Sequence, residues 1–360
     1  MSESATASAP AKTQPKAKKN RLSSGFFRFV LTRFLLIIPT VFILVTIVFF
    51  VMRATGDPIS AAMGGRLTPE ELQRRIHAAG YDRPLVVQYL DYLGGLLRGD
   101  LGTTLTDNQP VTTILTRYGA ATFELAFLSL IVALIVGIGL GRLAARRRDH
   151  AADAGIRVFA ILCYATPVFF LGLMLKLVFA VWLNVLPPSG RSSFASDMQF
   201  QRLVSPTGFY IIDAFQLGDM SVLVDVLRHA VLPALALGLL TAGVFIRLVR
   251  TNVISTYTSG YVEAARSRGV SEGRLLSKHA WRPAMIPIIT VMGMQIALML
   301  AGAVLTETTF EWKGFMLSQY LKQRDFVAVQ GIVILIAIIV AVVNFIVDVI
   351  SALIDPRVRY

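Results

Sequence analysis

Three ionisable residues fall inside or beside long apolar stretches of this chain: Glu124, Lys176 and Asp348. A charged side chain in such surroundings is costly unless it is paired, reaches water or lines a pathway for a polar solute. Glu124 and Asp348 lie near the ends of their stretches, where they could reach water, and the long Lys176 side chain could extend outward. We therefore predict for each residue either a structural pairing role or a place in a pathway or gate.

The other reactive residues form no catalytic or metal-binding pattern. The four histidines, His77, His150, His229 and His279, are scattered along the sequence, and a single cysteine, Cys163, excludes an intrachain disulfide. The sequence contains no G-x-x-x-x-G-K-[ST] loop, so this chain is not expected to bind a nucleotide through a P-loop. We expect a chain that is not an enzyme, with no catalytic residue, no metal site and no cofactor of its own.

Three closely spaced glycines, Gly137, Gly139 and Gly141, resemble a dinucleotide-binding loop at first sight. They lie inside an apolar stretch, however, and no predicted strand precedes them, as such a loop requires. The spacing from Gly137 to Gly141 is instead typical of helices that approach each other closely. We predict a packing role.

The segment 250–287 combines polar residues with helix-end signals. A short helix is expected to end at Gly269, because glycine adopts a positive φ angle readily. Ser271 is expected to cap a second short helix, and Pro283 then begins the next apolar stretch. Such a helical elbow suits docking into a groove of a soluble partner, but an ordinary solvated loop would explain the same residues equally well.

The elements that must position these residues are membrane helices. Of the 360 residues, 55% are hydrophobic and only 16% are charged, and the mean hydropathy is +0.64. Soluble domains carry about 25% charged residues, so much of this surface must face lipid. The net charge of +13 is therefore interpreted as a topology signal and not as a nucleic-acid-binding surface.

Six stretches are long and apolar enough to cross about 30 Å of hydrocarbon. They cover residues 34–52, 125–141, 158–182, 230–246, 283–306 and 326–353. The expected fold is all-α: a polytopic membrane protein with six transmembrane helices and a long first extracytoplasmic loop. Residues 1–26 are expected to form a disordered basic cytoplasmic tail and not a signal peptide.

The distribution of charge over the loops predicts the orientation in the membrane. The N-terminal tail, loops 142–157 and 247–282 and the C-terminus hold 21 Lys and Arg against 6 acidic residues. Loops 53–118, 183–229 and 307–325 hold 13 against 14. Because positively charged loops stay in the cytoplasm, both termini are expected to be cytoplasmic.

The sequence resembles the permease subunits of ABC importers. The residues that match the signature cytoplasmic loop of that family are Glu263, Ala264, Ala265, Arg266, Gly269, His279 and Pro283. Shorter motifs follow in order along the chain: Gly56-Asp57-Pro58, Asp82-Arg83-Pro84, Gly99-Asp100-Leu101-Gly102, Thr166-Pro167-Val168-Phe169 and Asp355-Pro356-Arg357. Together they narrow the resemblance to the dipeptide, oligopeptide and nickel permeases, and to the first, or B-type, of their two membrane subunits.

The resemblance implies a type I importer fold in the cytoplasmic membrane, in which the signature loop is a coupling helix that sits in a cleft of an ATPase subunit. The implied partners are a second homologous permease, two ABC ATPase subunits that bind ATP and Mg²⁺, an extracytoplasmic solute-binding protein and the lipid bilayer, but no nucleic acid. The chain would form half of a pathway for di- or oligopeptides. Nickel or another small ligand is the alternative cargo, and an autonomous secondary transporter is a more distant alternative.

Two residues depart from the family pattern. Lys313 stands where proline is usual in the turn after the fifth span, and Gly260 replaces a usual acidic residue before the signature loop. We divide the chain into the tail, a segment 27–118 with the first transmembrane helix and its loop, and a permease core 119–360 that contains the coupling loop 250–283.

Overall fold

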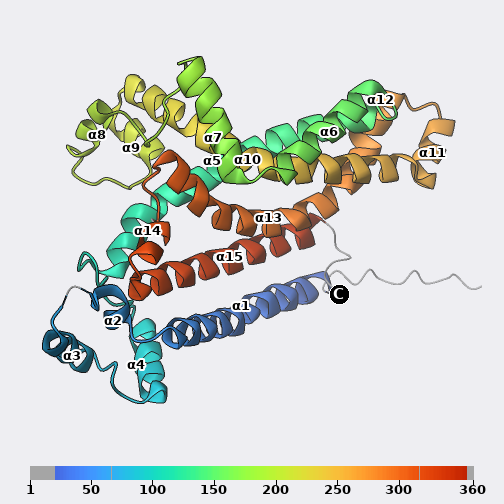
Figure 1. The fold of residues 1–360 in the computed structure, drawn as a ribbon. Helices are drawn as coiled ribbons and strands as arrows, with labels where there is room; N and C mark the ends of the chain where they lie inside the picture. Colours follow the sequence, from blue (N-terminus) through green and yellow to red (C-terminus); the bar gives the residue numbers. More distant parts are fainter. Residues whose placement is uncertain (1–20, 66, 316, 355–360) are drawn as a thin grey trace, which may run out of the picture.

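The computed structural model describes residues 21–354 except residues 66 and 316, and this part of the chain is helical (Figure 1). Among the described residues no strand forms, and the backbone of Thr103 and Pro110 makes a single isolated bridge. The expected all-α fold is confirmed. Residues 1–20 of the expected tail lie outside the described residues. Residues 21–26 of the expected tail belong instead to the first helix. This helix begins before the apolar stretch, because backbone hydrogen bonds form a helix outside lipid as well.

Five long helices contain five of the six expected apolar stretches. They are α1 (Arg21–Ala54), α5 (Val111–Arg146), α10 (Met220–Tyr257), α13 (Trp281–Phe310) and α15 (Phe326–Ile354). All five are long and apolar enough to cross a membrane. With 36 residues, α5 exceeds the roughly 20 that a bilayer requires, so its ends extend beyond the hydrocarbon layer. The boundary that we placed at residue 118 lies inside this continuous helix.

The third apolar stretch is broken, which corrects the expectation of one uninterrupted helix. It consists of α6 (Ala151–Ala165), α7 (Val168–Leu175) and a π-helical segment η1 (Lys176–Trp182), with a bend of 109° between α6 and α7. Pro167 has no N–H group and disfavours helical backbone at the residue before it, and Thr166 is accordingly extended with ψ 127°. Counted as one span, the bent pair brings the number of candidate spans to six.

Short helices gather at the two ends of the bundle (Figure 1). The elbow end carries α11 (Gly260–Ser267), α12 (Glu272–Arg274) and the π-helical η2 (Leu275–Ala280). The opposite end, called here the far end, carries α2 (Pro58–Met63), α3 (Pro69–Ala78), α4 (Leu85–Leu97), α8 (Phe194–Phe200), α9 (Tyr210–Leu217) and α14 (Leu317–Lys322). The expected loop 53–118 is therefore largely helical.

The core lies where α5 packs along α10, the most extensive helix contact in the described chain. A Cβ atom on Gly137 would lie 2.5 Å from the Cβ of Phe245, and one on Gly141 would lie 2.7 Å from the Cβ of Val249. Only glycine allows this approach, in agreement with the predicted packing role. By contrast α1 is peripheral, and large apolar side chains such as Ile38 are 62% exposed.

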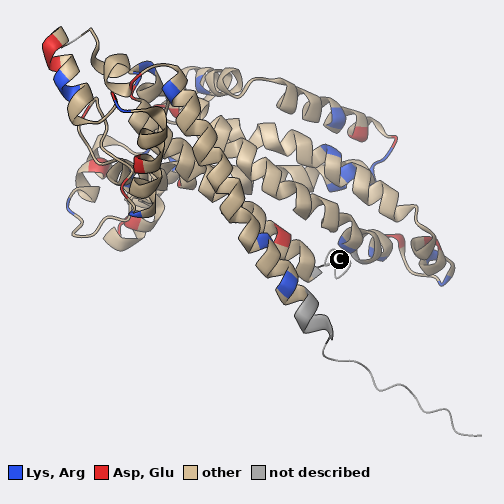
Figure 2. Ribbon diagram, turned by 90° about the horizontal axis from the view of Figure 1, so that it is seen from below, with Lys and Arg blue, Asp and Glu red and all other residues tan. Residues whose placement is uncertain are grey.

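Charged residues lie mainly at the two ends of the bundle (Figure 2). Between the ends, the long helices show few charged positions, as a hydrocarbon layer requires. The residues that could carry function therefore divide into an elbow-end group and a far-end group, with few ionisable side chains between them.

Candidate functional site

The elbow end contains most of the residues that the sequence singled out. Helix α11 ends in a Schellman motif: the N–H of Val270 donates to the carbonyl of Ala265 at 3.3 Å, and that of Gly269 to the carbonyl of Arg266 at 2.9 Å. Gly269 has the predicted positive φ, at +80°, in the left-handed region. This turn sends the chain back toward α13 and gives α11 a defined end.

An ion pair fixes the angle of the elbow. The Arg266 Nε atom donates to Glu272 Oε1 at 2.7 Å, and the Tyr257 hydroxyl donates to the other oxygen of the same carboxylate. The Arg266 guanidinium also lies over the Tyr257 ring, 5.0 Å from its centre. The Glu272 carboxylate, followed by the Tyr257 hydroxyl, raises the pKa of Arg266 above its usual range. The end of α10, helix α11 and the start of α12 are thus tied together.

The outer surface of α11 presents the signature residues. Val262 is fully buried and anchors the helix, whereas the Glu263 side chain is 69% exposed and Ala264 is also exposed. Glu263 lies 3.7 Å from the Arg266 Nη1 atom, so its charge is only loosely held within the chain. A short helix with small exposed side chains and an available carboxylate can enter a groove of another protein.

The second half of the elbow differs from the expectation. Ser271 stands at the cap position of α12 but its side chain makes no capping hydrogen bond, and α12 continues through η2 into α13. Pro283 therefore lies inside a helical run and does not begin it. Because Pro283 has no N–H, the turn before it cannot close the usual α-helical bond, and that turn is π-helical. His279 lies in this turn, partly buried, and η2 packs beside α11.

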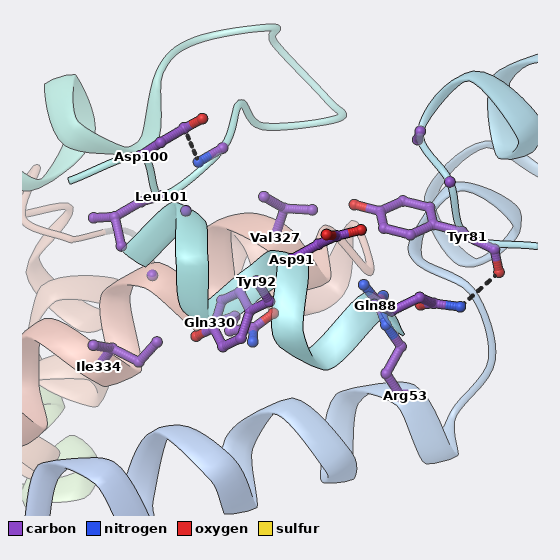
Figure 3. Close-up of a pocket in the computed structure, with 15 residues that line it drawn as sticks. Arg53, Tyr81, Gln88, Asp91, Tyr92, Asp100, Leu101, Val327, Gln330 and Ile334 are labelled. Carbon is purple, nitrogen blue, oxygen red and sulfur yellow. Dashed lines mark hydrogen bonds between the residues drawn. The ribbon is translucent and has the colours of Figure 1, made fainter. Parts of the chain in front are cut away.

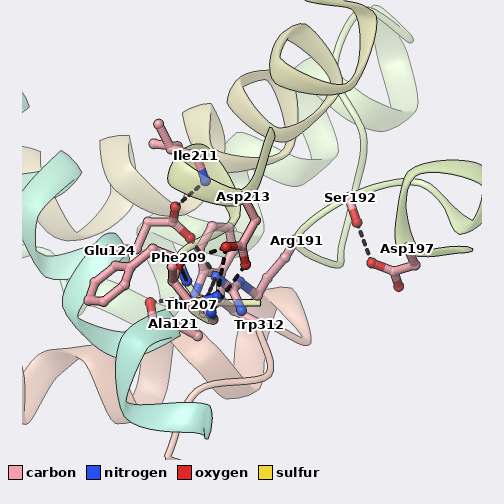
Figure 4. A network of polar contacts seen from close by, with 11 residues as sticks. Ala121, Glu124, Arg191, Ser192, Asp197, Thr207, Phe209, Ile211, Asp213 and Trp312 are labelled. Atoms are coloured by element: carbon pink, nitrogen blue, oxygen red, sulfur yellow. Dashed lines mark hydrogen bonds and ion pairs between the residues drawn. The ribbon is translucent and has the colours of Figure 1, made fainter. Parts of the chain in front are cut away.

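At the far end, Glu124 is buried in a polar network (Figure 4). It does not reach water: its side chain is 4% exposed, and Oε2 accepts a hydrogen bond from Arg191 Nη2 at 2.5 Å. The other oxygen accepts from the backbone N–H of Ile211 at 2.8 Å. A buried ion pair of this kind requires compensation of both charges, and Glu124 receives it from the segment between η1 and α10.

The same arginine joins two further elements. Its guanidinium lies 3.7 Å from the centre of the Tyr210 ring in α9 and 5.5 Å from that of Trp312, and Arg191 also donates to the Gly208 carbonyl. The Trp312 indole N–H donates to the Ala121 carbonyl of α5 at 2.9 Å. The turn after α13, the α8–α9 segment and α5 therefore meet around Arg191.

The other two ionisable candidates have separate partners. Lys176 does not extend outward: its Nζ atom donates to the Thr309 carbonyl at 2.9 Å, near the negative end of the α13 dipole. Asp348 lies 3.4 Å from Arg33 of α1, with both side chains partly exposed. The structure thus gives each of Glu124, Lys176 and Asp348 a different partner and does not bring the three together.

Besides Glu124, the described residues include four buried carboxylates that the sequence analysis did not single out: Asp153, Asp213, Glu307 and Asp325. Asp153 of α6 is fully buried and accepts two hydrogen bonds from Arg250 of α10, at 2.6 and 2.7 Å. Asp325, also fully buried, caps α15 and accepts from the backbone N–H groups of Leu105 and Thr106. Asp153 and Asp325 both belong to segments that the sequence analysis treated as loops, so nothing in the sequence indicated their burial.

These observations define a class: a multi-span membrane subunit with a helical elbow at one end and a helical cap at the other. The chain belongs to the family described as binding-protein-dependent transport system inner membrane components. The family model matches residues 137–360, and the model for the N-terminal part of the same membrane components matches residues 26–125. The chain is accordingly a multi-pass inner-membrane protein and a transport permease subunit, as the resemblance implied.

Curated relatives cover nearly the whole chain. The di/tripeptide transport system permease protein of Pseudomonas aeruginosa strain UCBPP-PA14 is 36% identical over 92% of this chain and 98% of its own length. The dipeptide transport system permease protein of Escherichia coli K12 is also 36% identical, over 92% and 99%. The glutathione transport system permease protein of Salmonella choleraesuis is 31% identical, over 92% and 99%. These relatives are transport permeases and not enzymes.

Proposed function

We propose that this chain is the B-type membrane subunit of an ATP-driven importer of di- or oligopeptides. The observation that carries the proposal is similarity over 92% of the chain to permeases named for dipeptide and di/tripeptide transport. The chain would form half of the translocation pathway, and a second homologous permease would form the other half. Two partner ATPase subunits would bind ATP and Mg²⁺, and an extracytoplasmic binding protein would deliver the peptide.

In this proposal the elbow transmits the movement of the ATPases. Helix α11 offers Glu263 and Ala264 on its exposed surface, and the Schellman turn at Gly269 with the Arg266–Glu272 pair supports its rigidity. A rigid connection lets a displacement of α11 reach the ends of α10 and α13, so that the helices rock as bodies between inward- and outward-open states. His279, beside α11, would contribute to the same docking surface.

The orientation follows from charge. The elbow end carries the start of α1 and the two positively charged loops, and the distribution of Lys and Arg along the sequence supports a cytoplasmic position for the elbow and both termini. The far end would then face the extracytoplasmic side, where α2–α4, α8 and α9 offer a docking surface for the binding protein. The contacts of Lys176 and Asp348 support a role as ties between helices. Glu124, with Arg191, would hold the far-end cap, meaning the α8–α9 segment, against α5 during rocking.

The proposal is tested by purifying the full-length chain from its own membranes in mild detergent and identifying the proteins that accompany it. We expect a second permease, P-loop ATPases and a solute-binding protein. Reconstituted into proteoliposomes, the complex should take up labelled dipeptide only with ATP and the binding protein present. Recovery of the chain alone under conditions that preserve related complexes, or uptake without ATP, would contradict the importer assignment; uptake of nickel chelates in place of peptides would contradict only the cargo.

A further inference from the structure

A cavity of about 310 Å³ opens at the far end, away from the Glu124 network and from the elbow. The last turn of α1, the α3–α4 turn, α4 and the first turns of α15 enclose it (Figure 3). Its polar lining comes from Arg53, Tyr81, Gln88, Tyr92 and Gln330, and from two carboxylates, Asp91 and Asp100. Asp100, Leu101 and Gly102, from one of the motifs noted in the sequence, belong to the lining, whereas Glu124, Lys176, Asp348 and the signature-loop residues do not.

Four of the lining residues have a buried polar atom without a hydrogen bond of normal geometry to any described residue: Arg53 Nε, Gln88 Oε1, Tyr92 Oη and Gln330 Nε2. The side chains of Tyr92 and Gln330 interact with each other, so Arg53 Nε and Gln88 Oε1 are the two atoms most available to a ligand. Gln88 and Gln330 are each only 9% exposed. The Gln88 amide nitrogen is held by the carbonyls of Tyr81 and Arg83, at 2.9 and 2.8 Å, which leaves its oxygen to the cavity. Buried polar atoms are normally satisfied, so this concentration in one cavity points to a ligand.

The unsatisfied groups specify the chemistry of that ligand. Arg53 lies over the Tyr81 ring at 4.4 Å and forms no ion pair with any other residue that the structure describes. Burial raises the pKa of Tyr92 to about 12, so its hydroxyl remains a neutral donor at physiological pH. Arg53, Tyr92 and Gln330 therefore offer donors for an anionic group. The Gln88 oxygen and Asp91, which is 3.5 Å from Arg83, offer acceptors in the same cavity.

The position of the cavity distinguishes a lipid from a free solute. Arg53 lies in the last turn of α1, where this apolar span ends. Large apolar side chains stand exposed on the two helices that border the cavity: Phe50 of α1 is 47% exposed, and Val86 and Leu90 of α4 are 68% and 61% exposed. A polar cavity beside an exposed apolar surface, at the level where a span leaves the membrane, suits an amphipathic molecule.

We propose that this cavity binds the headgroup of a phospholipid that carries both a phosphate and an ammonium group, as phosphatidylethanolamine does. The phosphate contacts Arg53, Tyr92 and Gln330, the ammonium contacts the Gln88 oxygen and Asp91, and the acyl chains lie along α1 and α4. A bound lipid ties α1 and α4 to α15. The proposal does not depend on which solute the importer carries.

The test uses the full-length chain in its purified complex, delipidated in detergent, and follows thermal unfolding during titration with short-chain lipids. Phosphatidylethanolamine should raise the Tm in a saturable way and at lower concentration than phosphatidylglycerol, which lacks the ammonium. In Arg53→Gln the half-saturating concentration should rise about tenfold, because a charge-assisted hydrogen bond is lost. The matched control is Arg98→Gln, because Arg98 is an exposed arginine at the end of α4 outside the lining. This substitution should change the half-saturating lipid concentration less than about twofold.

Equal responses to the two lipids, or equal shifts in Arg53→Gln and Arg98→Gln, would overturn the proposal. Soluble glycerophosphoethanolamine that binds as tightly as the lipid would assign the cavity to a free solute and overturn the lipid assignment. If the Arg53→Gln variant does not assemble, the proposal is tested on the unmodified complex by crosslinking with a photoactivatable phosphatidylethanolamine. Crosslinks concentrated in residues 81–102 and 327–334 are expected, and crosslinks spread evenly over the apolar surface would overturn it.

Discussion

Replacing Gly269 with valine should uncouple ATP hydrolysis from transport without preventing membrane insertion. Gly269 has φ +80°, and a Cβ atom placed there would meet nothing within 4 Å. The cost of a side chain is therefore conformational and not steric. For an L-residue the left-handed region costs about 1–2 kcal/mol, and a β-branched residue lies at the upper end of this range.

The expected size of the effect follows from that cost. A change of about 1–2 kcal/mol alters a two-state equilibrium by a factor of about 5–30. If the Schellman turn defines the docking geometry of α11, the fraction of elbows in that geometry falls by this factor. ATP-driven uptake in proteoliposomes should then fall at least about fivefold. Uptake should fall less in the Gly269→Asn variant, because asparagine tolerates the left-handed region better than other non-glycine residues.

The matched control is Gly273→Ala. Gly273 lies four residues further along the same elbow, also has open space around its Cβ position, and has an ordinary φ. Its replacement should leave uptake nearly unchanged. Uptake at the unmodified level by Gly269→Val in a fully assembled complex would refute the assignment of this turn as the coupling element. Equal losses in Gly269→Val and Gly273→Ala would refute the conformational reasoning.

Three further substitutions test the packing and the buried charges, each measured by thermal unfolding in detergent. Arg191→Met should destabilise the far-end cap by about 3–5 kcal/mol, because Glu124 is left buried and unpaired. Adding Glu124→Gln should restore part of the lost stability. If the double variant restores none of it, the two residues do not form a direct pair. Asp325→Ala should cost about 3 kcal/mol and speed proteolysis of the segment before α5, and an unchanged cleavage rate would count against that tether. Gly137→Val should lower the stability by at least about 1–3 kcal/mol, whereas Gly139→Val, which has open space around its Cβ position, should lower it by less than about 0.5 kcal/mol. Similar losses of stability in the two variants would exclude close packing as the cause.

Hydropathy predicts the length of the third span but not the bend within it. Residues 158–182 are apolar throughout apart from Lys176, so composition alone favours one helix. The bend depends on Pro167 and on the conformation that it imposes on Thr166. The Thr166-Pro167 motif was visible in the sequence, but proline is tolerated inside other helices of this chain, as Pro233 and Pro287 show. At Pro167 the bend also brings α7 into contact with α10 and α13, and these contacts are a property of the tertiary structure.

In the elbow too, one feature was predictable from the sequence and another was not. The turn at Gly269 was predictable, because a left-handed residue after a short helix is a local property of the backbone. The Arg266–Glu272–Tyr257 cluster was not predictable, since no sequence pattern pairs Glu272 with residues of two other helices. Its partners meet it through the reversal of the chain, and such a contact depends on the three-dimensional path of three helices.

The sequence by itself determined the class of the protein, its apolar spans, the Gly269 turn and the close approach at Gly137 and Gly141. All of these follow from local composition or from spacing along one helix. The tertiary structure alone decided the partners of the buried charges, such as Arg191 for Glu124, and the cavity bordered by Arg53. Those groups lie tens to hundreds of residues apart in sequence, and a buried charge or an unsatisfied amide is defined by which helices enclose it.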